Sequence, residues 1–262
     1  MRIDSSTRAL VTGASRGIGR ATARALAARG ARVGLVARGE EELDALAEEI
    51  GERASVHPAD VADREATERA VAGFAEEAGG LDVAVANAGI ARYAPFTEQD
   101  PDDAERMVLV NVLGTINTVR AALEPMLDRA SGHIVVLSSG AGLRAFPWAA
   151  VYGATKAADR GFAEALRHEL SGTGVSVSTI YPGEVQTSLH AEAKQLPDWR
   201  NSKDAIPAEQ VAEATVEAIE EDKREVFIPS QVRLLGLNGL APGLLDRLLA
   251  ALRGGAAAPR RY

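Results

Sequence analysis

A tyrosine and a lysine that lie four residues apart, Tyr152 and Lys156, are the residues best suited to proton transfer. On a helix this spacing places the phenol and the ammonium on the same face. A nearby cation favours the phenolate form, so Lys156 would ease proton exchange by Tyr152 near neutral pH. Ser138 and Ser139 end an apolar run typical of a buried strand, and strand ends in open α/β sheets face the ligand crevice. A tyrosine and a lysine at this spacing are more often a surface pair, and the two serines at the predicted strand end favour a role in a site.

A glycine-rich turn, Thr12–Gly19 (TGASRGIG), follows the first apolar run and precedes an Ala-rich helical stretch. Its glycines would permit a tight turn, close approach of the backbone to a pyrophosphate, and close helix–strand packing. The N-terminus of the following helix would offer free N–H groups and a positive dipole end to the phosphates. We therefore predict a nucleotide site that includes Gly13, Ser15, Arg16, Gly17, Ile18 and Gly19.

The charges at the end of the second predicted strand indicate which nucleotide binds. An NAD site usually has a carboxylate about twenty residues beyond the glycine turn, but here Ala37 stands where it would lie and Arg38 follows. Arg38 and Arg16 could bind a 2′-phosphate through their guanidinium groups. Alternatively, both are solvated surface residues. The acidic run Glu40–Glu42 is interpreted as a first helical turn that stabilises the helix dipole. NADP(H) is favoured over NAD(H).

The combined motifs resemble those of the short-chain dehydrogenase/reductase family, in particular its NADP(H)-preferring single-domain type. The similarity extends from about Thr7 to Thr187 and keeps the family's order and spacing. Its motifs are the glycine turn, Asn87-Ala88-Gly89, Asn111, Ser139, Tyr152, Lys156 and Pro182-Gly183.

This resemblance implies four catalytic residues. Tyr152 would be the general acid/base, and Lys156 would assist it while holding the hydroxyls of the nicotinamide ribose. Ser139 would hydrogen-bond the substrate oxygen, because its spacing to Tyr152 matches the family better than that of Ser138. Asn111 would order a water for a proton relay through Lys156. Taken singly, each residue also has a structural interpretation, such as helix packing for Asn111.

The resemblance also implies cofactor contacts beyond the glycine turn. Asn87, Ala88 and Gly89 would border the adenosine ribose and steady the central strand. Asp60 and Val61 would lie beside the adenine ring, although Asp60 could instead cap a helix. Near the nicotinamide we expect the turn and hydroxyl formed by Pro182, Gly183, Val185 and Thr187.

The substrate side is expected to be apolar. We place its wall in the segments Ala91–Phe96, Gly140–Trp148 and 184–206, with Ser139, Leu143, Trp148 and Tyr152 as contacts. Further apolar or aromatic candidates are Tyr93, Phe96, Phe146, Leu189 and Leu196. Such a wall favours a small uncharged or hydrophobic substrate. Steroid, fatty acyl, polyol, quinone and terpenoid substrates all remain open.

Alternating short apolar runs and longer helical stretches predict a Rossmann-like, doubly wound α/β fold of about seven parallel strands with helices on both faces. We expect one domain, 1–262, with 184–206 as a substrate-side lid and 231–262 as a C-terminal extension. The predicted strands are Ala9–Val11, Val33–Val36, Ser55–His57, Val83–Ala86, Ile134–Leu137, Val175–Ile180 and Val226–Ile228. The predicted helices are Ile18–Ala28, Glu40–Ile50, Arg64–Ala78, Pro101–Leu127, Ala150–Leu170 and Ala208–Glu221.

Composition narrows the class of protein. The net charge of −8 argues against nucleic-acid binding, and no apolar run is long enough for stable membrane insertion. The absence of cysteine suits a cytoplasmic location, and the scattered histidines predict no metal site. Small residues along the Tyr152 helix (Gly153, Ala154, Ala157, Ala158 and Gly161) indicate a homodimer or homotetramer.

The leading hypothesis is an NADP(H)-dependent oxidoreductase that moves a hydride between the nicotinamide and a carbonyl or secondary alcohol. A non-enzymatic NADP-binding regulator is an alternative, because folds are reused without chemistry. A pure binder would have little need of Ser139, Tyr152 and Lys156 together. An epimerase or dehydratase of the same family is a third reading, which the short chain disfavours.

Overall fold

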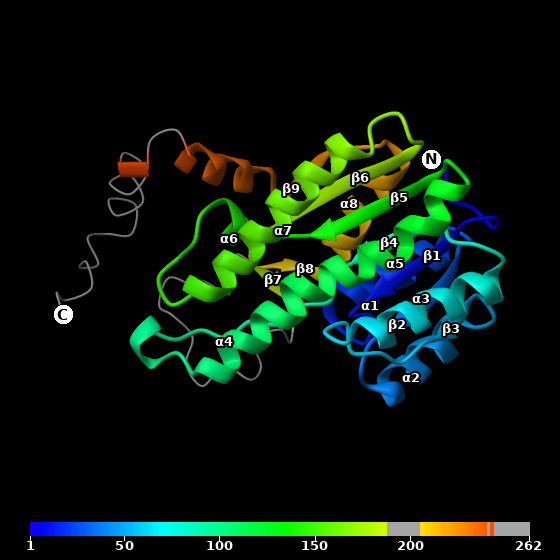
Figure 1. Ribbon diagram of the computed structural model, residues 1–262, viewed down its shortest axis with the longest axis horizontal. Coiled ribbons are helices and arrows are strands. Elements are labelled where there is room, and N and C mark those ends of the chain that lie inside the picture. The colour runs from blue at the N-terminus through cyan, green and yellow to red at the C-terminus, as the bar shows by residue number, and fades with distance from the viewer. Residues whose placement is uncertain (188–204, 240–241, 244–262) are drawn as a thin grey trace.

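The computed structural model describes residues 1–187, 205–239 and 242–243, and its centre is a seven-stranded parallel sheet (Figure 1). The strand order is β3-β2-β1-β4-β5-β6-β9. The strands are β1 (Arg8–Thr12), β2 (Arg32–Val36), β3 (Ala54–Val56), β4 (Val83–Ala86), β5 (Gly132–Leu137), β6 (Val175–Pro182) and β9 (Glu225–Ile228). The predicted Rossmann-like fold with seven parallel strands is confirmed.

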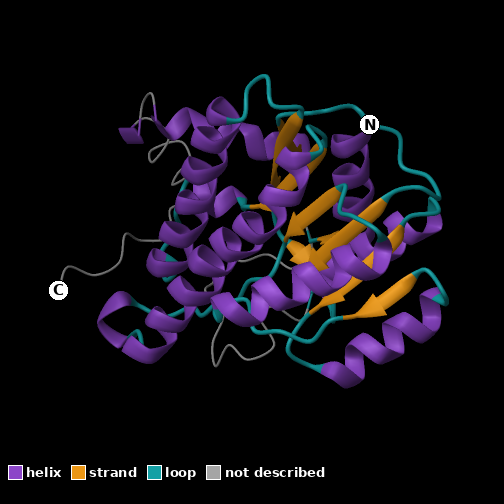
Figure 2. Ribbon diagram, turned by 45° about the vertical axis from the view of Figure 1, so that its right-hand side comes forward, coloured by secondary structure: helices purple, strands orange, loops and turns teal. Residues whose placement is uncertain are grey.

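Helices cover both faces of the sheet (Figure 2). One face packs against α1 (Gly17–Ala28), α2 (Glu40–Ile50) and α8 (Ala208–Glu220). The other packs against α3 (Arg64–Ala78), α5 (Gly114–Asp128) and α7 (Ala150–Glu169). These six helices agree with the predicted ranges to within two residues at most ends.

Strand β5 shows why the central strands read as unbroken apolar runs. Ile134 and Val136 belong to the core under α3, α5 and α7, whereas Val135 and Leu137 belong to the core under α1 and α8. Successive side chains of a strand point to opposite faces, so a sheet covered on both faces needs apolar residues at every position. The two hydrophobic cores therefore hold the sheet from both sides.

The order in which strands are added to the sheet reverses between β1 and β4. From β1 the chain builds outward through β2 and β3, and from β4 it builds the opposite way through β5, β6 and β9. Val11 of β1 pairs in register with Val85 of β4, so both strands end at the same edge. Ligands of open α/β sheets bind in the crevice beyond such a reversal. The glycine turn and Asn87 both follow strands that end there.

The predicted helix Pro101–Leu127 is wrong in one respect. The structure divides it into α4 (Pro101–Met107), a wider π-helical stretch (Val108–Leu113) and α5. A π-helical turn shifts the following side chains around the axis and is frequent at functional sites. Here it contains Asn111, whose side chain reaches across to another segment.

The two irregular segments are described only in part. Residues 184–187 and 205–206 of the predicted lid are described, and β7 (Val185–Gln186) pairs with β8 (Ile206–Pro207). Leu189 and Leu196 lie outside the described residues, as does the Leu-rich stretch 244–252. The predicted extension begins as a 3-10 helix, Ser230–Gly239. A short helix that was not predicted, α6 (Gly140–Leu143), follows β5.

Within the described ranges, none of the helices combines the length and apolar character needed to cross a membrane.

Candidate functional site

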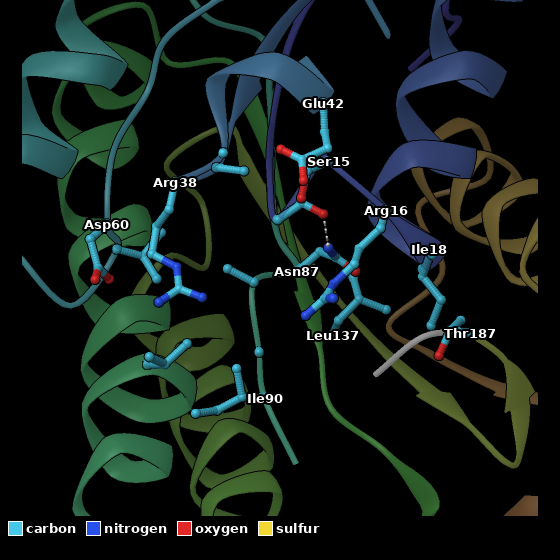
Figure 3. Close-up of a pocket in the computed structure, with 18 of the residues that line it drawn as sticks. Ser15, Arg16, Ile18, Arg38, Glu42, Asp60, Asn87, Ile90, Leu137 and Thr187 are labelled. Atoms are coloured by element: carbon cyan, nitrogen blue, oxygen red, sulfur yellow. Dashed lines mark hydrogen bonds between the residues drawn. The ribbon is translucent and has the colours of Figure 1, made fainter. Parts of the chain in front are cut away.

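A cavity of about 520 Å³ opens at the carboxyl ends of β1, β4 and β5 (Figure 3). It is lined by residues of the glycine turn, of the loops that follow the central strands, and of helix α7. The predicted residues that line it are Gly13, Ser15, Arg16, Gly17, Ile18, Arg38, Asp60, Val61, Asn87, Ala88, Gly89, Tyr152, Lys156, Pro182 and Thr187. The structure thus brings both ends of the predicted site, the turn and the Tyr152/Lys156 pair, into one space.

The glycine turn has the backbone geometry that its sequence requires. Gly13 and Gly17 have φ angles of +68° and +56°, a region that residues with a Cβ rarely adopt. At Gly19 a Cβ would lie 2.2 Å from the carbonyl oxygen of Gly13, so only glycine fits. The side chain of Arg16, the N-cap residue of α1, makes no hydrogen bond to the first turn of the helix, and the N–H groups of that turn suit an anion.

Asn87 fastens the glycine turn to the central strand. Its Nδ2 donates to the carbonyl oxygens of Thr12 and Gly13 at 2.8 and 3.3 Å. The Thr12 hydroxyl accepts the backbone N–H groups of Asn87 and Ala88 at 3.1 and 3.2 Å. These bonds tie the turn to the end of β4, and the two bonds donated by Nδ2 explain why an amide suits position 87.

Arg16 and Arg38 approach the cavity from opposite sides in Figure 3. Both side chains are exposed, whereas Ala37, which lies between the end of β2 and Arg38 in the sequence, is buried. Glu42 of α2 also lines this end of the cavity, and its Oε2 lies 2.1 Å from where a Cβ on Gly39 would be. The sequence interpretation assigned Glu42 only to the helix dipole, because its reach toward the cavity depends on how α2 packs.

Asp60 lines the cavity but is already engaged by the protein. Its Oδ1 accepts the backbone N–H of Ala62 at 3.0 Å, and its Oδ2 pairs with the guanidinium of Arg106 on α4. Partial burial raises the pKa of Asp60, but the bonds from Arg106 and Ala62 outweigh it and hold the pKa below its usual value. The sequence interpretation missed Arg106, since no local signal links it to a residue 46 positions away.

Tyr152 and Lys156 lie on the cavity side of α7 and are largely buried, at 8% and 5% exposure. The Tyr152 ring packs edge-on against Tyr93 with ring centroids 5.9 Å apart, in an apolar cluster with Ala91 and Met107. Nζ of Lys156 donates to the carbonyl oxygen of Leu137 at 2.8 Å. Both side chains are therefore held by packing and hydrogen bonds.

The predicted catalytic residues Asn111 and Ser139 do not line the cavity itself. Asn111 accepts the backbone N–H of Ile90 at 2.8 Å and donates to the carbonyl oxygen of Ile90 and to Thr155. Ser138 is buried and donates to the carbonyl oxygen of Lys156 at 2.8 Å. Ser139 remains partly exposed at the N-terminus of α6, where its Oγ accepts the N–H of Ala141 at 3.1 Å.

Several predicted residues lie outside the cavity lining. Gly19 supports the turn from behind, a Cβ on Gly183 would contact Val232 and Pro229, and Val185 is buried in the core beside α8. The predicted substrate contacts Leu143, the last residue of α6, and Trp148, on the loop before α7, are half-buried, and the backbone carbonyl oxygen of Trp148 accepts the N–H of Ala94 at 3.1 Å. Phe96 is 72% exposed. Further lining residues, none of them among the predicted site residues, are Ala37, Gly39, Glu42, Ala59, Ile90, Val110, Leu137 and Ser138.

No group of three His, Cys, Asp or Glu residues in the described part of the chain could hold a metal ion.

Sequence relatives of this chain are oxidoreductases. The model of the short chain dehydrogenase family matches residues 7–197. An uncharacterized oxidoreductase of Listeria monocytogenes is 41% identical over 186 residues, which cover 69% of this chain and 75% of that protein.

Solved structures share the fold over most of the chain. An alcohol dehydrogenase from the archaeon Thermococcus sibiricus, complexed with 5-hydroxy-NADP, has a TM-score of 0.76 and 30% identity, over 84% of this chain and 95% of that one. A short chain dehydrogenase/reductase from Burkholderia phymatum, in complex with NAD, has a TM-score of 0.84 and 26% identity, over 94% and 96%. With the sheet reversal, the glycine turn and the family match in agreement, this chain belongs to the short chain dehydrogenase family of oxidoreductases.

Proposed function

We propose that this protein is an NADP(H)-dependent oxidoreductase that transfers a hydride between the nicotinamide and a carbonyl or secondary alcohol carbon. One observation carries the proposal: Tyr152 and Lys156 line the same cavity as the glycine turn. A nucleotide with its phosphates on the N-terminus of α1 would extend from Arg38 toward this pair. A cavity of about 520 Å³ with free helix N–H groups at one end suits such a ligand.

The chain's own residues would manage the proton and the developing charge, while the bound cofactor supplies or accepts the hydride. Ser139 and the protonated Tyr152 would donate hydrogen bonds to the substrate oxygen and stabilise the alkoxide. Tyr152 would then give up its proton to that oxygen. Lys156, whose ammonium is buried beside Tyr152, would stabilise the resulting phenolate. Asn111 would anchor a relay that returns a proton to Tyr152.

The choice of NADP(H) over NAD(H) rests on Arg16 and Arg38 beside a buried Ala37. A relative whose structure contains 5-hydroxy-NADP and another that contains NAD support a nicotinamide cofactor of either kind. Glu42 lines the same end of the cavity and would repel a 2′-phosphate. Asp60 also lines the cavity but is paired with Arg106, which leaves Arg16 and Arg38 against Glu42, so we expect a moderate preference for NADP(H).

The proposed substrate is small and uncharged or hydrophobic. Tyr152 belongs to an apolar cluster whose members include Ala91, Tyr93, Met107 and Phe146. We also propose 1–262 as one domain and the segment 184–206 as a lid over this side. Of that segment, Thr187 lines the cavity, and the pairing of β7 with β8 brings its two described ends together. Leu143 and Trp148 are proposed as substrate contacts from the opposite loop.

The test of the proposed function is a panel of aldehydes, ketones and secondary alcohols followed by nicotinamide absorbance. We expect oxidation of NADPH with at least one uncharged carbonyl compound, and reduction of NADP⁺ with the matching alcohol. Tight NADPH binding without turnover on any member of a broad panel would instead favour the regulatory alternative. Turnover of a sugar nucleotide without net change in absorbance would favour an epimerase or dehydratase.

A homodimer or homotetramer is also proposed, with α7 at the interface. Ala154, Ala157, Ala158 and Gly161 are exposed on this helix, and a Cβ on Gly161 would meet nothing within 4 Å. Gly153 does not belong to this face, because a Cβ there would lie 2.8 Å from Ala145 of the same chain. Small exposed residues permit close helix approach. Light scattering should give a mass of two or four chains at micromolar concentration, and a monomer would contradict the assignment.

A further inference from the structure

A buried carboxylate, that of Asp159, accompanies the Tyr152/Lys156 pair on α7. Asp159 is 1% exposed, and its Oδ2 accepts a hydrogen bond from Nζ of Lys156 at 2.9 Å. Removing two charges from water is costly, and an apolar residue of similar size would usually serve helix packing as well. The position of this carboxylate three residues beyond Lys156 therefore points to a role in the site rather than in packing.

The bond to Asp159 fixes the direction of the Lys156 ammonium. A lysine ammonium has three N–H donors. One donates to the carbonyl oxygen of Leu137 at 2.8 Å and a second to Asp159 at 2.9 Å. These two partners belong to β5 and α7, and they leave one donor for the cavity that Lys156 lines. Asp159 thus holds the ammonium in the orientation in which it can serve the cavity.

Asp159 also controls the charge of Lys156. Burial alone would lower the pKa of Lys156, but the carboxylate of Asp159, with a smaller contribution from Tyr152, outweighs burial and raises that pKa above its usual value. For Asp159 itself, burial raises the pKa above its usual value, and the ammonium of Lys156 and the hydroxyl of Thr115 only partly oppose that effect. The lysine consequently stays positively charged although it is almost fully buried.

The other groups around the pair are mostly neutral. On the side of α5 and the π-helical stretch they are Asn111 and Thr115, which bond to each other through the Asn111 carbonyl oxygen and the Thr115 hydroxyl at 2.8 Å. Thr115 also contacts Asp159. From β5 and its end come the Leu137 carbonyl oxygen and Ser138. Tyr93, a titratable phenol, packs on the Tyr152 ring.

We propose that Asp159 is a positioning residue that orients Lys156 and, by partly neutralising its field at Tyr152, sets the pH at which Tyr152 exchanges its proton. This inference rests on the proposed function. The sign follows from charge: while Lys156 keeps its proton, an unopposed ammonium stabilises phenolate, and a carboxylate beside the ammonium weakens that stabilisation. If Lys156 instead lost its proton without Asp159, the phenolate would lose its stabilising charge and the midpoint would rise, which would contradict the inference. Removing the carboxylate charge should therefore move phenolate formation, and the alcohol oxidation that depends on it, to lower pH.

The test is Asp159→Asn, which keeps the shape of the side chain and removes its charge. We expect the pH midpoint of kcat/KM for alcohol oxidation to fall by roughly one unit. The pH midpoint of phenolate formation by Tyr152 should fall by a similar amount. It is measured by ultraviolet difference titration against the matching Tyr152→Phe variants. This titration needs no substrate, so it tests the inference even if the proposed activity is absent. Asp159→Leu, which leaves no polar group to bury, serves the same titration if the amide variant does not fold.

Asp82→Asn is the matched control. Asp82 is also buried and paired, with Arg8 at 2.7 Å and Arg129 at 2.8 Å, but it lies at the start of β4, away from the cavity. Both variants should lower thermal stability, whereas only the Asp159 variants should shift the pH midpoints. Midpoints for Asp159→Asn and Asp159→Leu that coincide with those of the parent protein would overturn the inference and leave Asp159 a structural residue.

Discussion

Replacing Tyr152 with phenylalanine is expected to reduce turnover by roughly 10² or more while NADPH still binds, because general acid–base catalysis contributes on that scale. The substitution removes one hydroxyl and keeps the ring that packs against Tyr93, Ala91 and Met107. The backbone of the glycine turn and the Lys156 ammonium are untouched. The measurement is kcat on the best substrate from the panel, together with the dissociation constant of NADPH by fluorescence titration.

Tyr181→Phe provides the control for loss of a tyrosine hydroxyl. Tyr181 is fully buried, stacks on Phe227 at 4.9 Å between ring centroids, and hydrogen-bonds Glu225 at 3.0 Å, outside the cavity lining. Its variant should lose some stability and keep turnover close to that of the parent. If Tyr152→Phe also kept near-normal turnover, another group would have to donate the proton and the assignment of Tyr152 would be wrong.

The fold could be predicted from the sequence because its parallel strands are covered on both faces. Runs such as Val33–Val36 and Ile134–Leu137 are apolar at every position, and the helices between them are amphipathic and Ala-rich. Two hydrophobic cores impose both patterns, so pattern and architecture agree. The glycine turn was equally legible, since Gly13 and Gly17 adopt φ angles that other residues rarely do.

The features that the sequence did not disclose depend on contacts between distant segments. The π-helical stretch around Asn111 has no local signature, because it arises from the fit of that helix against Ile90 and Thr155. The pairing of Arg106 with Asp60 and the presence of Glu42 at the cavity follow from how α4 and α2 pack. In the sequence nothing distinguishes Asp159 from an exposed polar residue of a helix, because its burial beside Lys156 depends on how α7 packs.

The second large effect is expected at the adenosine end of the cavity, where Arg38→Ala should weaken NADPH much more than NADH. The 2′-phosphate carries nearly two negative charges, and a hydrogen bond to a charged group contributes about 1.5–3 kcal/mol. Arg16 and Arg38 are both exposed, so solvent reduces this benefit. We expect the parent protein to favour NADPH by roughly tenfold to a thousandfold. The preference should decline as salt is added, because exposed charges are screened.

Two further variants separate attraction from repulsion at this end of the cavity. Glu42→Gln removes the one carboxylate of α2 that lines the cavity, so NADPH affinity should rise while NADH affinity changes little. Ala37→Asp combined with Arg38→Ala should move the preference toward NADH. Ala37 is buried and lines the cavity, so a carboxylate there would accept hydrogen bonds from the free ribose hydroxyls and repel a 2′-phosphate.

The pair of dissociation constants for NADPH and NADH, measured for each variant by fluorescence titration, decides the cofactor. We call the dissociation constant of NADH divided by that of NADPH the preference ratio. A preference ratio that falls in Arg38→Ala, rises in Glu42→Gln and drops below one in the double variant would establish that charge at this end selects NADP(H). Glu42→Gln moves the preference opposite to the other two variants, so a general loss of stability could not imitate this pattern. Equal affinities in the parent, or an Arg38→Ala variant that binds both cofactors less tightly by the same factor, would leave Arg38 a solvated surface residue. The remaining explanation would then be an enzyme without strong selection at the 2′ position, in which Glu42 offsets Arg16 and Arg38.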